Sequence, residues 1–245
     1  MNLPADPGAL RGVGLLGKVY IPVGKTGIIY DILRDTTSNF QLPHYLSWPA
    51  ITGCRGSLFL ISGYNVPQFT LTNAGWCFLN MREWQQIMPI PTPRARACCV
   101  SHNGNVYVIG GSNQGILNTV ESYDPLTNCW SVRQPMPVAV CEAACAVYRQ
   151  HIYVIGGLHE VQRRVGVVQR YNPVTNTWTL LETTISCPRD ELSAVVFRDK
   201  LYVMCGDDGR QRVKVVESFD GVTWKIEQNV HDLVFRVVDV CNVNE

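Results

Sequence analysis

One motif recurs along most of this chain at intervals of 46 to 49 residues, and it constrains the fold more than any other feature. Two copies are almost identical, Asn-Val-Tyr-Val-Ile-Gly-Gly at 105–111 and His-Ile-Tyr-Val-Ile-Gly-Gly at 151–157. An aromatic turn and a tryptophan follow each copy. The tryptophans at 84, 130, 178 and 224 are spaced by 46, 48 and 46 residues. A fixed period of roughly 20–50 residues indicates a structure built from stacked copies of one unit.

Three further copies of the motif are weaker. Their strand-like runs lie at 18–24, 57–63 and 200–206, and each departs from the double glycine. The pairs found there are Val23-Gly24, Ser62-Gly63 and Cys205-Gly206, and Phe40 stands in place of the first tryptophan. The repeat therefore predicts five units, of which the first is the most degraded.

Within one unit the side-chain pattern predicts four β-strands, at 96–102, 104–109, 117–123 and 129–134. Asp124-Pro125 predicts a type I turn, because proline presets φ and the aspartate accepts a hydrogen bond from the turn backbone. The double glycine permits positive φ and close approach of neighbouring strands. Four strands cannot cover both of their apolar faces alone, whereas sheets stacked radially bury them against each other, as in a propeller.

A strand ending in Gly-Gly, followed by Tyr-Asp-Pro and a spaced tryptophan, resembles the kelch repeat, and the resemblance extends over residues 17–245. It implies an all-β kelch β-propeller with five four-stranded blades. The blades are expected near 17–47, 48–91, 92–137, 138–185 and 186–229, after an N-terminal segment at 1–16. Apolar spacing at 76–88 also fits a helix, but the register of the repeat predicts two strands around 80–83.

The two ends of the chain predict how the ring closes. The first unit has little room for an inner strand before Gly17, whereas a surplus apolar segment at 233–242 follows the last unit. We expect this C-terminal strand to close blade 1, which joins the termini and removes exposed sheet edges. The alternative is an incomplete six-bladed ring, six being the more familiar kelch number. Five blades are favoured, because an open ring would leave two apolar blade faces in water.

Composition argues against several classes of function. The net charge is +1, whereas proteins held to nucleic acid by phosphate contacts usually carry a basic excess. No apolar run approaches the length of a transmembrane helix, and the N-terminus lacks a signal-peptide pattern, so no membrane association is expected. Most of the ten cysteines lie in apolar runs, which favours reduced, buried thiols. These features predict a cytoplasmic protein, and we expect a monomer.

No catalytic or cofactor motif is found in the sequence. It contains no Gly-x-Ser-x-Gly, His-Glu-x-x-His or P-loop, and no Gly-x-Gly-x-x-Gly after a strand. Cys-x-x-Cys is missing and the five histidines are scattered, so neither a metal nor another cofactor is predicted. Some kelch-like propellers are enzymes, including a copper-radical oxidase and a sialic acid epimerase, but no copper constellation is visible here. We predict that the chain is not an enzyme, and a small-molecule enzyme is the least favoured alternative.

Three charged residues mark one candidate binding region. Arg96, Glu142 and Glu191 lie eleven residues before the central aromatic residue of three successive repeats. This register predicts that they begin the innermost strands, at one mouth of the central channel. The resemblance to peptide-binding kelch proteins implies that side chains at this position reach a ligand. The alternative is that they are solvated strand ends.

The loops after the glycine pairs are expected on the same face, where function on a propeller is carried. Two of these loops, at 158–164 and 207–212, are cationic, and their arginines are Arg163, Arg164, Arg210 and Arg212. Arginine suits bidentate recognition of carboxylates and phosphates, so an acidic or phosphorylated peptide is the predicted ligand. The alternative is a charged surface kept for solubility.

The sequence therefore favours a protein-interaction module over an enzyme. Many kelch proteins carry BTB and BACK domains and present substrates to a cullin ubiquitin ligase, and the resemblance implies the substrate-reading part of such an adaptor. A cullin would be a partner only if BTB and BACK domains exist elsewhere. The alternative from the structural class is binding to actin or the cytoskeleton.

Overall fold

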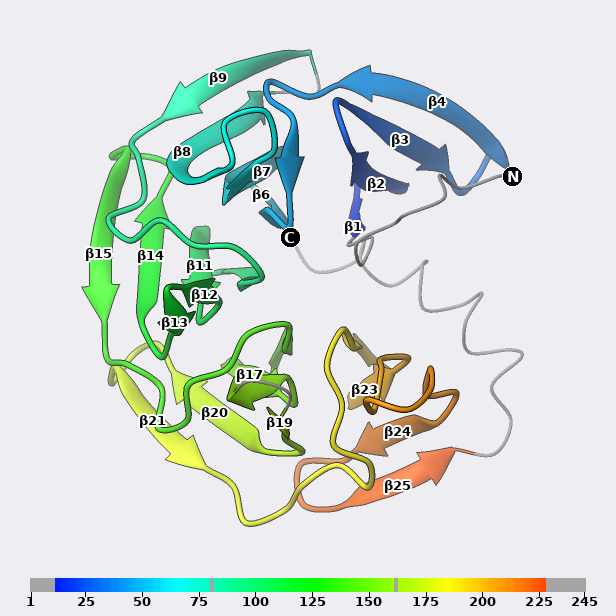
Figure 1. Cartoon of the computed structure of the whole chain (residues 1–245). Helices are drawn as coiled ribbons and strands as arrows, with labels where there is room; N and C mark the ends of the chain where they lie inside the picture. The colour runs from blue at the N-terminus through cyan, green and yellow to red at the C-terminus, as the bar shows by residue number, and fades with distance from the viewer. Residues whose placement is uncertain (1–11, 80–81, 161–162, 228–245) are drawn as a thin grey trace.

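The computed structural model describes residues 12–79, 82–160 and 163–227, which form five main antiparallel sheets around a common centre (Figure 1). Each sheet is one blade of a β-propeller, and the blades follow one another in chain order. The described residues contain no helix, and hence none long and apolar enough to cross a membrane. The predicted all-β fold is confirmed, with five blades rather than six.

The strands of the blades are as follows. Blade 1 contains β1 (Val13–Leu15), β2 (Lys18–Val23), β3 (Thr26–Asp31) and β4 (Thr36–Gln41). Blade 2 contains β5 (Leu46–Ser47), β6 (Ala50–Cys54), β7 (Ser57–Asn65), β8 (Thr70–Leu79) and β9 (Glu83–Ile87). Blade 3 contains β10 (Cys98–His102), β11 (Asn105–Ile109), β14 (Val120–Asp124) and β15 (Cys129–Arg133). Blade 4 contains β16 (Ala144–Tyr148), β17 (His151–Ile155), β20 (Val168–Asn172) and β21 (Thr177–Leu180). Blade 5 contains β22 (Ser193–Phe197), β23 (Lys200–Met204), β24 (Val216–Phe219) and β25 (Trp224–Glu227).

Two small hairpins project from blades 3 and 4, in the loops that follow the double glycines. They are β12 (Ser112–Asn113) with β13 (Gly115–Ile116), and β18 (Leu158–Glu160) with β19 (Arg163–Arg164). Within the segment 76–88, residues 76–79 belong to β8 and residues 83–87 to β9, so the register of the repeat predicted these strands correctly and the helical alternative is wrong.

Burial along a blade follows from its position between two neighbours. In blade 3, Val106–Ile109 of β11 and Val120–Tyr123 of β14 are buried on both faces, whereas the outer strand β15 is largely exposed. A strand that is covered on both faces has a nearly continuous apolar run instead of an alternating one. The Tyr-Val-Ile runs of the motif are therefore the middles of the blades, where two blade faces pack at once.

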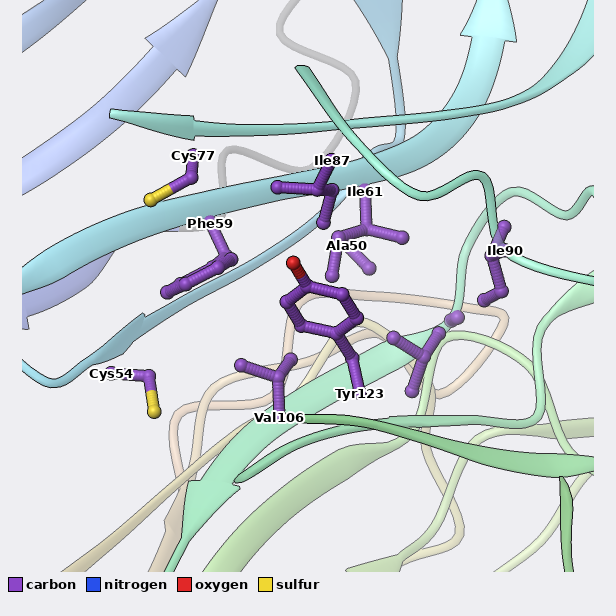
Figure 2. Close-up of a cluster of buried hydrophobic side chains, with 11 residues drawn as sticks. Ala50, Cys54, Phe59, Ile61, Cys77, Ile87, Ile90, Val106 and Tyr123 are labelled. Carbon is purple, nitrogen blue, oxygen red and sulfur yellow. The ribbon is translucent and has the colours of Figure 1, made fainter. Parts of the chain in front are cut away.

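The core lies between adjacent blades, in four clusters that join each blade to the next. Figure 2 shows the cluster between blades 2 and 3, where Tyr123 lies against Phe59 and Ala50. The ring centroids of Phe59 and Tyr123 are 6.0 Å apart. Cys54 and Cys77 belong to the same cluster, so these cysteines pack as small buried apolar side chains.

Hydrogen bonds at the rim and near the channel also connect successive blades. Trp130 Nε1 donates to the carbonyl of Met88 at 2.7 Å, and Trp178 Nε1 donates to the carbonyl of Gln134 at 2.8 Å, each in the preceding blade. Near the channel, the second residue of the pair in blades 2 to 4, a glycine in each case, donates its N–H to the next blade, as Gly157 does to the carbonyl of Arg189 at 2.8 Å. The spaced tryptophan and the second glycine are thus the residues that join one repeat to its neighbour.

Blade 1 differs from the prediction. Its inner strand is β1, which pairs with β2 from Val13↔Tyr20 to Leu15↔Lys18, so the expectation that no inner strand precedes Gly17 is wrong. Three residues before a tight turn at Leu16-Gly17 are enough for this strand, and they lie within the segment 1–16 that we placed outside the propeller. The closing strand expected at 233–242 lies outside the described residues and stays a prediction.

Candidate functional site

Four residues form a belt of backbone hydrogen bonds at one end of the inner strands, and we call them the mouth belt: Trp48, Arg96, Glu142 and Glu191. Each lies two residues before the inner strand of its blade, in blades 2 to 5. The N–H groups of Arg96, Glu142 and Glu191 donate to the carbonyl of the preceding member at 3.1, 2.9 and 2.9 Å. This chain of bonds brings together three predicted residues from three separate repeats.

All four residues of the mouth belt have positive φ, between 50° and 59°. Residues other than glycine rarely adopt this left-handed conformation, and such strained backbone tends to occur at functional sites. Four equivalent occurrences show that the conformation is part of the repeat, set by the bonds from blade to blade. Its consequence is that the side chains are held at the mouth on a backbone that hydrogen bonds between blades 2 to 5 fix.

Side chains of the mouth belt also contact one another. The guanidinium carbon of Arg96 lies 4.5 Å from the ring centroid of Trp48, a cation–π contact, and Arg96 Nε lies 3.2 Å from Glu142 Oε1. The Arg96 side chain is 36% exposed, whereas that of Glu142 is 9% exposed. The cation of this pair is therefore accessible to solvent, and its carboxylate is nearly buried.

A cavity of about 620 Å³ opens beside Trp48 and Arg96 of the mouth belt, over blades 2 to 4. Trp48 and Arg96 line it together with Arg164, and the loop 112–116 and Leu158 complete the side formed by blades 3 and 4. A volume of this size is typical of ligand pockets. Arg96 and Arg164 are the two charged residues among its lining, so the charge that the cavity presents is positive.

Blade 2 contributes a hairpin that the sequence analysis did not predict. Strands β7 and β8 continue past the position of the double glycine, and Tyr64, paired with Leu71 in this extension, lines the cavity beside it. The Oγ of Ser62, which replaces the first glycine, lies 2.7 Å from the carbonyl oxygens of both Thr72 and Arg94, which share its single O–H donor. The serine that replaces glycine in this blade therefore holds the base of the hairpin that extends the cavity wall.

The loop of blade 3 is held by a buried arginine. Arg94 is fully buried, and its Nη1 donates to the carbonyls of Gly110 and Thr119 at 2.9 and 3.1 Å. These carbonyls flank the loop 112–116, and the Glu121 carboxylate forms a buried ion pair with the same guanidinium. Burial lowers the pKa of Arg94, and the charge of Glu121 opposes that change. Arg94 thus fixes both ends of a loop that lines the cavity.

Arg164 joins the loops of blades 4 and 5. Its Nε donates to Asp190 Oδ1 at 3.1 Å and its Nη2 donates to Asp207 Oδ1 at 3.1 Å. Burial raises the pKa of Asp190, while the charge of Arg164 and its hydrogen bond act in the opposite direction. Arg164 is therefore committed to two carboxylates at the edge of the cavity, and it remains partly exposed there.

The other arginines predicted for the site occupy different surroundings. Arg212 forms an ion pair with Glu191 of the mouth belt, which raises the pKa of Arg212. Arg163 and Arg210 are exposed and are not among the lining residues of the cavity. The loop carrying Arg210 is held by Asp208, whose Oδ1 accepts the N–H groups of Arg210 and Gln211 at 2.8 and 2.9 Å. These backbone bonds lower the pKa of Asp208.

Five of the predicted residues therefore belong to two ion-paired groups: Arg96 with Glu142, and a network in which Asp207 pairs with both Arg164 and Arg212, while Arg164 also pairs with Asp190 and Arg212 with Glu191. The loop face is less cationic than its arginine content suggested, because three arginines have carboxylate partners. Trp48 was missed, although it stands eleven residues before Phe59, the offset that identified the other belt residues. Within 12–79, 82–160 and 163–227, no group of His, Cys, Asp and Glu could hold a metal ion.

Comparisons with known proteins agree with this fold and repeat. The model of the Kelch motif matches residues 93–137 and 139–183, which are blades 3 and 4. Kelch-like protein 23 of Mus musculus is 30% identical over 219 residues, or 83% of this chain and 36% of that protein. Kelch-like protein 30 of Homo sapiens is 34% identical over 202 residues, or 79% of this chain and 33% of that protein. The chain spans about a third of the length of these curated relatives.

Proposed function

We propose that this chain, which is a kelch-repeat β-propeller, binds a segment of another protein at the face formed by the mouth belt and the loops of blades 2 to 5. The cavity over blades 2 to 4 is the observation that carries the proposal. Loops from three blades surround it, and its backbone is fixed by hydrogen bonds between blades. A preformed cavity of this kind lets a ligand bind without ordering the protein, which reduces the entropic cost of association.

The segment that we propose is acidic. Both charged residues that line the cavity are arginines, and Arg210 lies exposed on the loop of blade 5. Glu142 and Asp190 lie deeper than the lining arginines that they pair with, since their side chains are 9% and 4% exposed, whereas Asp207, the second partner of Arg164, is 27% exposed. A guanidinium carries five N–H donors, so Arg96, which pairs with Glu142 through Nε, retains donors for a ligand carboxylate. Arg164 uses Nε and Nη2 for its two carboxylate partners, which leaves the donors of Nη1 for a ligand.

The biological role that we propose is recognition, without catalysis. By its resemblance to kelch-like adaptors, the propeller would select a substrate, while BTB and BACK domains elsewhere in a longer protein would contact a cullin ubiquitin ligase. The cytosol is the compartment in which we expect the partner. Binding to actin filaments is the alternative, and co-sedimentation of the purified chain with filaments tests it.

Reversing the charge of Arg210 is expected to weaken capture of the partner without changing the fold. The Arg210 side chain is exposed and its loop is held by Asp208 through the backbone, so Arg210→Glu should alter the free energy of unfolding by only about 0.5 kcal/mol. Affinity for an acidic segment should fall about tenfold or more, because the introduced glutamate would repel the carboxylates that the arginine attracts. Affinity capture from cytosol with wild type and variant measures this.

Lys225→Glu is the matched control, since it makes the same charge change on the exposed outer strand β25. It should capture as well as the wild type, and capture by the wild type should weaken as salt rises. Equal capture by Arg210→Glu and wild type at low and high salt would show that the acidic segment proposed here is wrong.

A further inference from the structure

The cavity has an apolar side that the cationic loops do not explain. Its wall contains Tyr64 and Leu71 from the hairpin of blade 2, Ile116 from the loop of blade 3 and Leu158 from the loop of blade 4. Trp48 of the mouth belt lies at the same cavity. None of these five side chains belongs to the hydrophobic clusters between blades, so packing of the core does not explain why apolar residues stand at these positions. Apolar side chains that line a preformed cavity favour an apolar group of a ligand.

The positive charges lie directly beside this apolar side. Arg96 contacts the Trp48 ring at 4.5 Å, so one guanidinium borders the aromatic wall. Arg164 lines the same cavity, and no carboxylate is among the lining residues. The cavity therefore offers two complementary features at once: a hydrophobic wall and an adjacent cationic edge.

From this arrangement we infer that the cavity binds a peptide segment in which a bulky apolar side chain stands next to a carboxylate. The apolar side chain packs against Tyr64, Leu71 and Ile116, and the carboxylate faces Arg96 and Arg164. The inference rests on the proposed function, and it adds the class of segment that the site selects. It differs from recognition of a purely acidic peptide, because the apolar side chain of the peptide, which we call the anchor, packs against the hairpin of blade 2 and the loop of blade 3.

The cavity volume of about 620 Å³ fits this class of ligand. It lies within the range of roughly 300–1,000 Å³ that holds a drug-sized ligand, so it admits more than one side chain of a peptide. Burying one large apolar side chain corresponds to roughly ten- to hundredfold in affinity. The anchor is thus expected to contribute at least as much to binding as the charge contact.

Selection of peptides from a random dodecapeptide library displayed on phage tests the inference on the full chain. The enriched peptides should share an aromatic or long aliphatic residue beside Asp or Glu. The dissociation constant of the best peptide should then rise at least about tenfold for Ile116→Asp, because the substitution puts a charge on the apolar wall. Val174→Asp is the matched control, since Val174 is 87% exposed at the outer turn of blade 4, and it should bind like the wild type.

Changes in the peptide separate the two features of the cavity. Replacing its Asp or Glu by the amide, or its apolar anchor by alanine, should each weaken binding about tenfold or more. The inference would be overturned if the enriched peptides were acidic without an apolar anchor, and if their binding were lost in Arg210→Glu but unchanged in Ile116→Asp. That result would leave the proposed function standing. Enriched peptides that bind every variant equally, or no enrichment at all, would overturn both.

Discussion

Arg94→Val is expected to reduce the free energy of unfolding by about 3–5 kcal/mol, because it leaves the buried carboxylate of Glu121 without its cation. Both side chains of this pair are almost completely removed from water, at 0% and 2% exposure. The substitution also removes the donors to the carbonyls of Gly110 and Thr119. Loss of stability should therefore be accompanied by disorder of the loop 112–116, which lines the cavity.

The chain itself supplies a compensating change for this variant. In blade 4 the positions equivalent to Arg94 and Glu121 are occupied by Val140 and Gln169. Gln169 accepts the N–H of Val138 at 2.8 Å and donates to the carbonyl of the same residue at 3.0 Å, so a neutral amide satisfies the site without an arginine. Arg94→Val combined with Glu121→Gln should recover at least half of the stability that Arg94→Val loses.

Urea unfolding followed by circular dichroism measures both variants. The first should unfold at a clearly lower urea concentration than the wild type, and the double variant at an intermediate one. A single variant as stable as the wild type would show that the ion pair does not hold the loop. A double variant no better than the single one would contradict the equivalence of the two blades.

Gly157→Ala is expected to destabilise the chain by about 3 kcal/mol or more, through backbone strain and overpacking together. The φ of Gly157 is +99°, and a Cβ there would lie 2.6 Å from the carbonyl oxygen of Cys141, which is backbone and cannot turn away. Its N–H bond to Arg189 in the next blade would be disturbed as well. The melting temperature should fall by roughly 6–12 °C.

Gly56→Ala is the control for this prediction. Gly56 also has positive φ, +69°, but a Cβ at this position would meet no other atom within 4 Å. Blades 4 and 5 carry Gln150 and Asp199 at the equivalent turn position, with φ of 63° and 54°. Gly56→Ala should therefore lower the free energy of unfolding by only about 1–2 kcal/mol, which is the cost of the left-handed conformation. Equal losses in the two variants would show that the close approach between blades is not what requires Gly157.

The glycine pair also shows how far the sequence could predict the fold. The period, the four strands of a unit and the number of blades followed from the repeat, because each motif residue has a role between blades. What the motif could not show is that its two glycines differ. Ser62 and Cys205 occupy the first position with φ of 57° and 59°, whereas the second is glycine in blades 2 to 5, with φ between 95° and 113°. The weaker copies therefore lost only the replaceable glycine.

Prediction of the candidate site was less complete, for a different reason. A fixed offset from the central aromatic residue placed Arg96, Glu142 and Glu191 at one mouth, because the register of a repeat translates directly into position. Pairing between loops has no such register. The contacts of Arg164 with Asp190 and Asp207 join two blades, and their geometry depends on loop lengths that vary from unit to unit. The hairpin of blade 2 was missed for the same reason.

Photocrosslinking tests the central claim, that the loop face binds another protein, most directly. A benzoylphenylalanine replaces Phe69, which is 76% exposed at the tip of the hairpin beside the cavity, or Val174 on the outer turn of blade 4. After irradiation in cytosol, the label at 69 should form a discrete adduct that excess unlabelled wild type suppresses, and the label at 174 should form none. An adduct at 174 alone, equal adducts at both positions, or none that competition suppresses would contradict the claim.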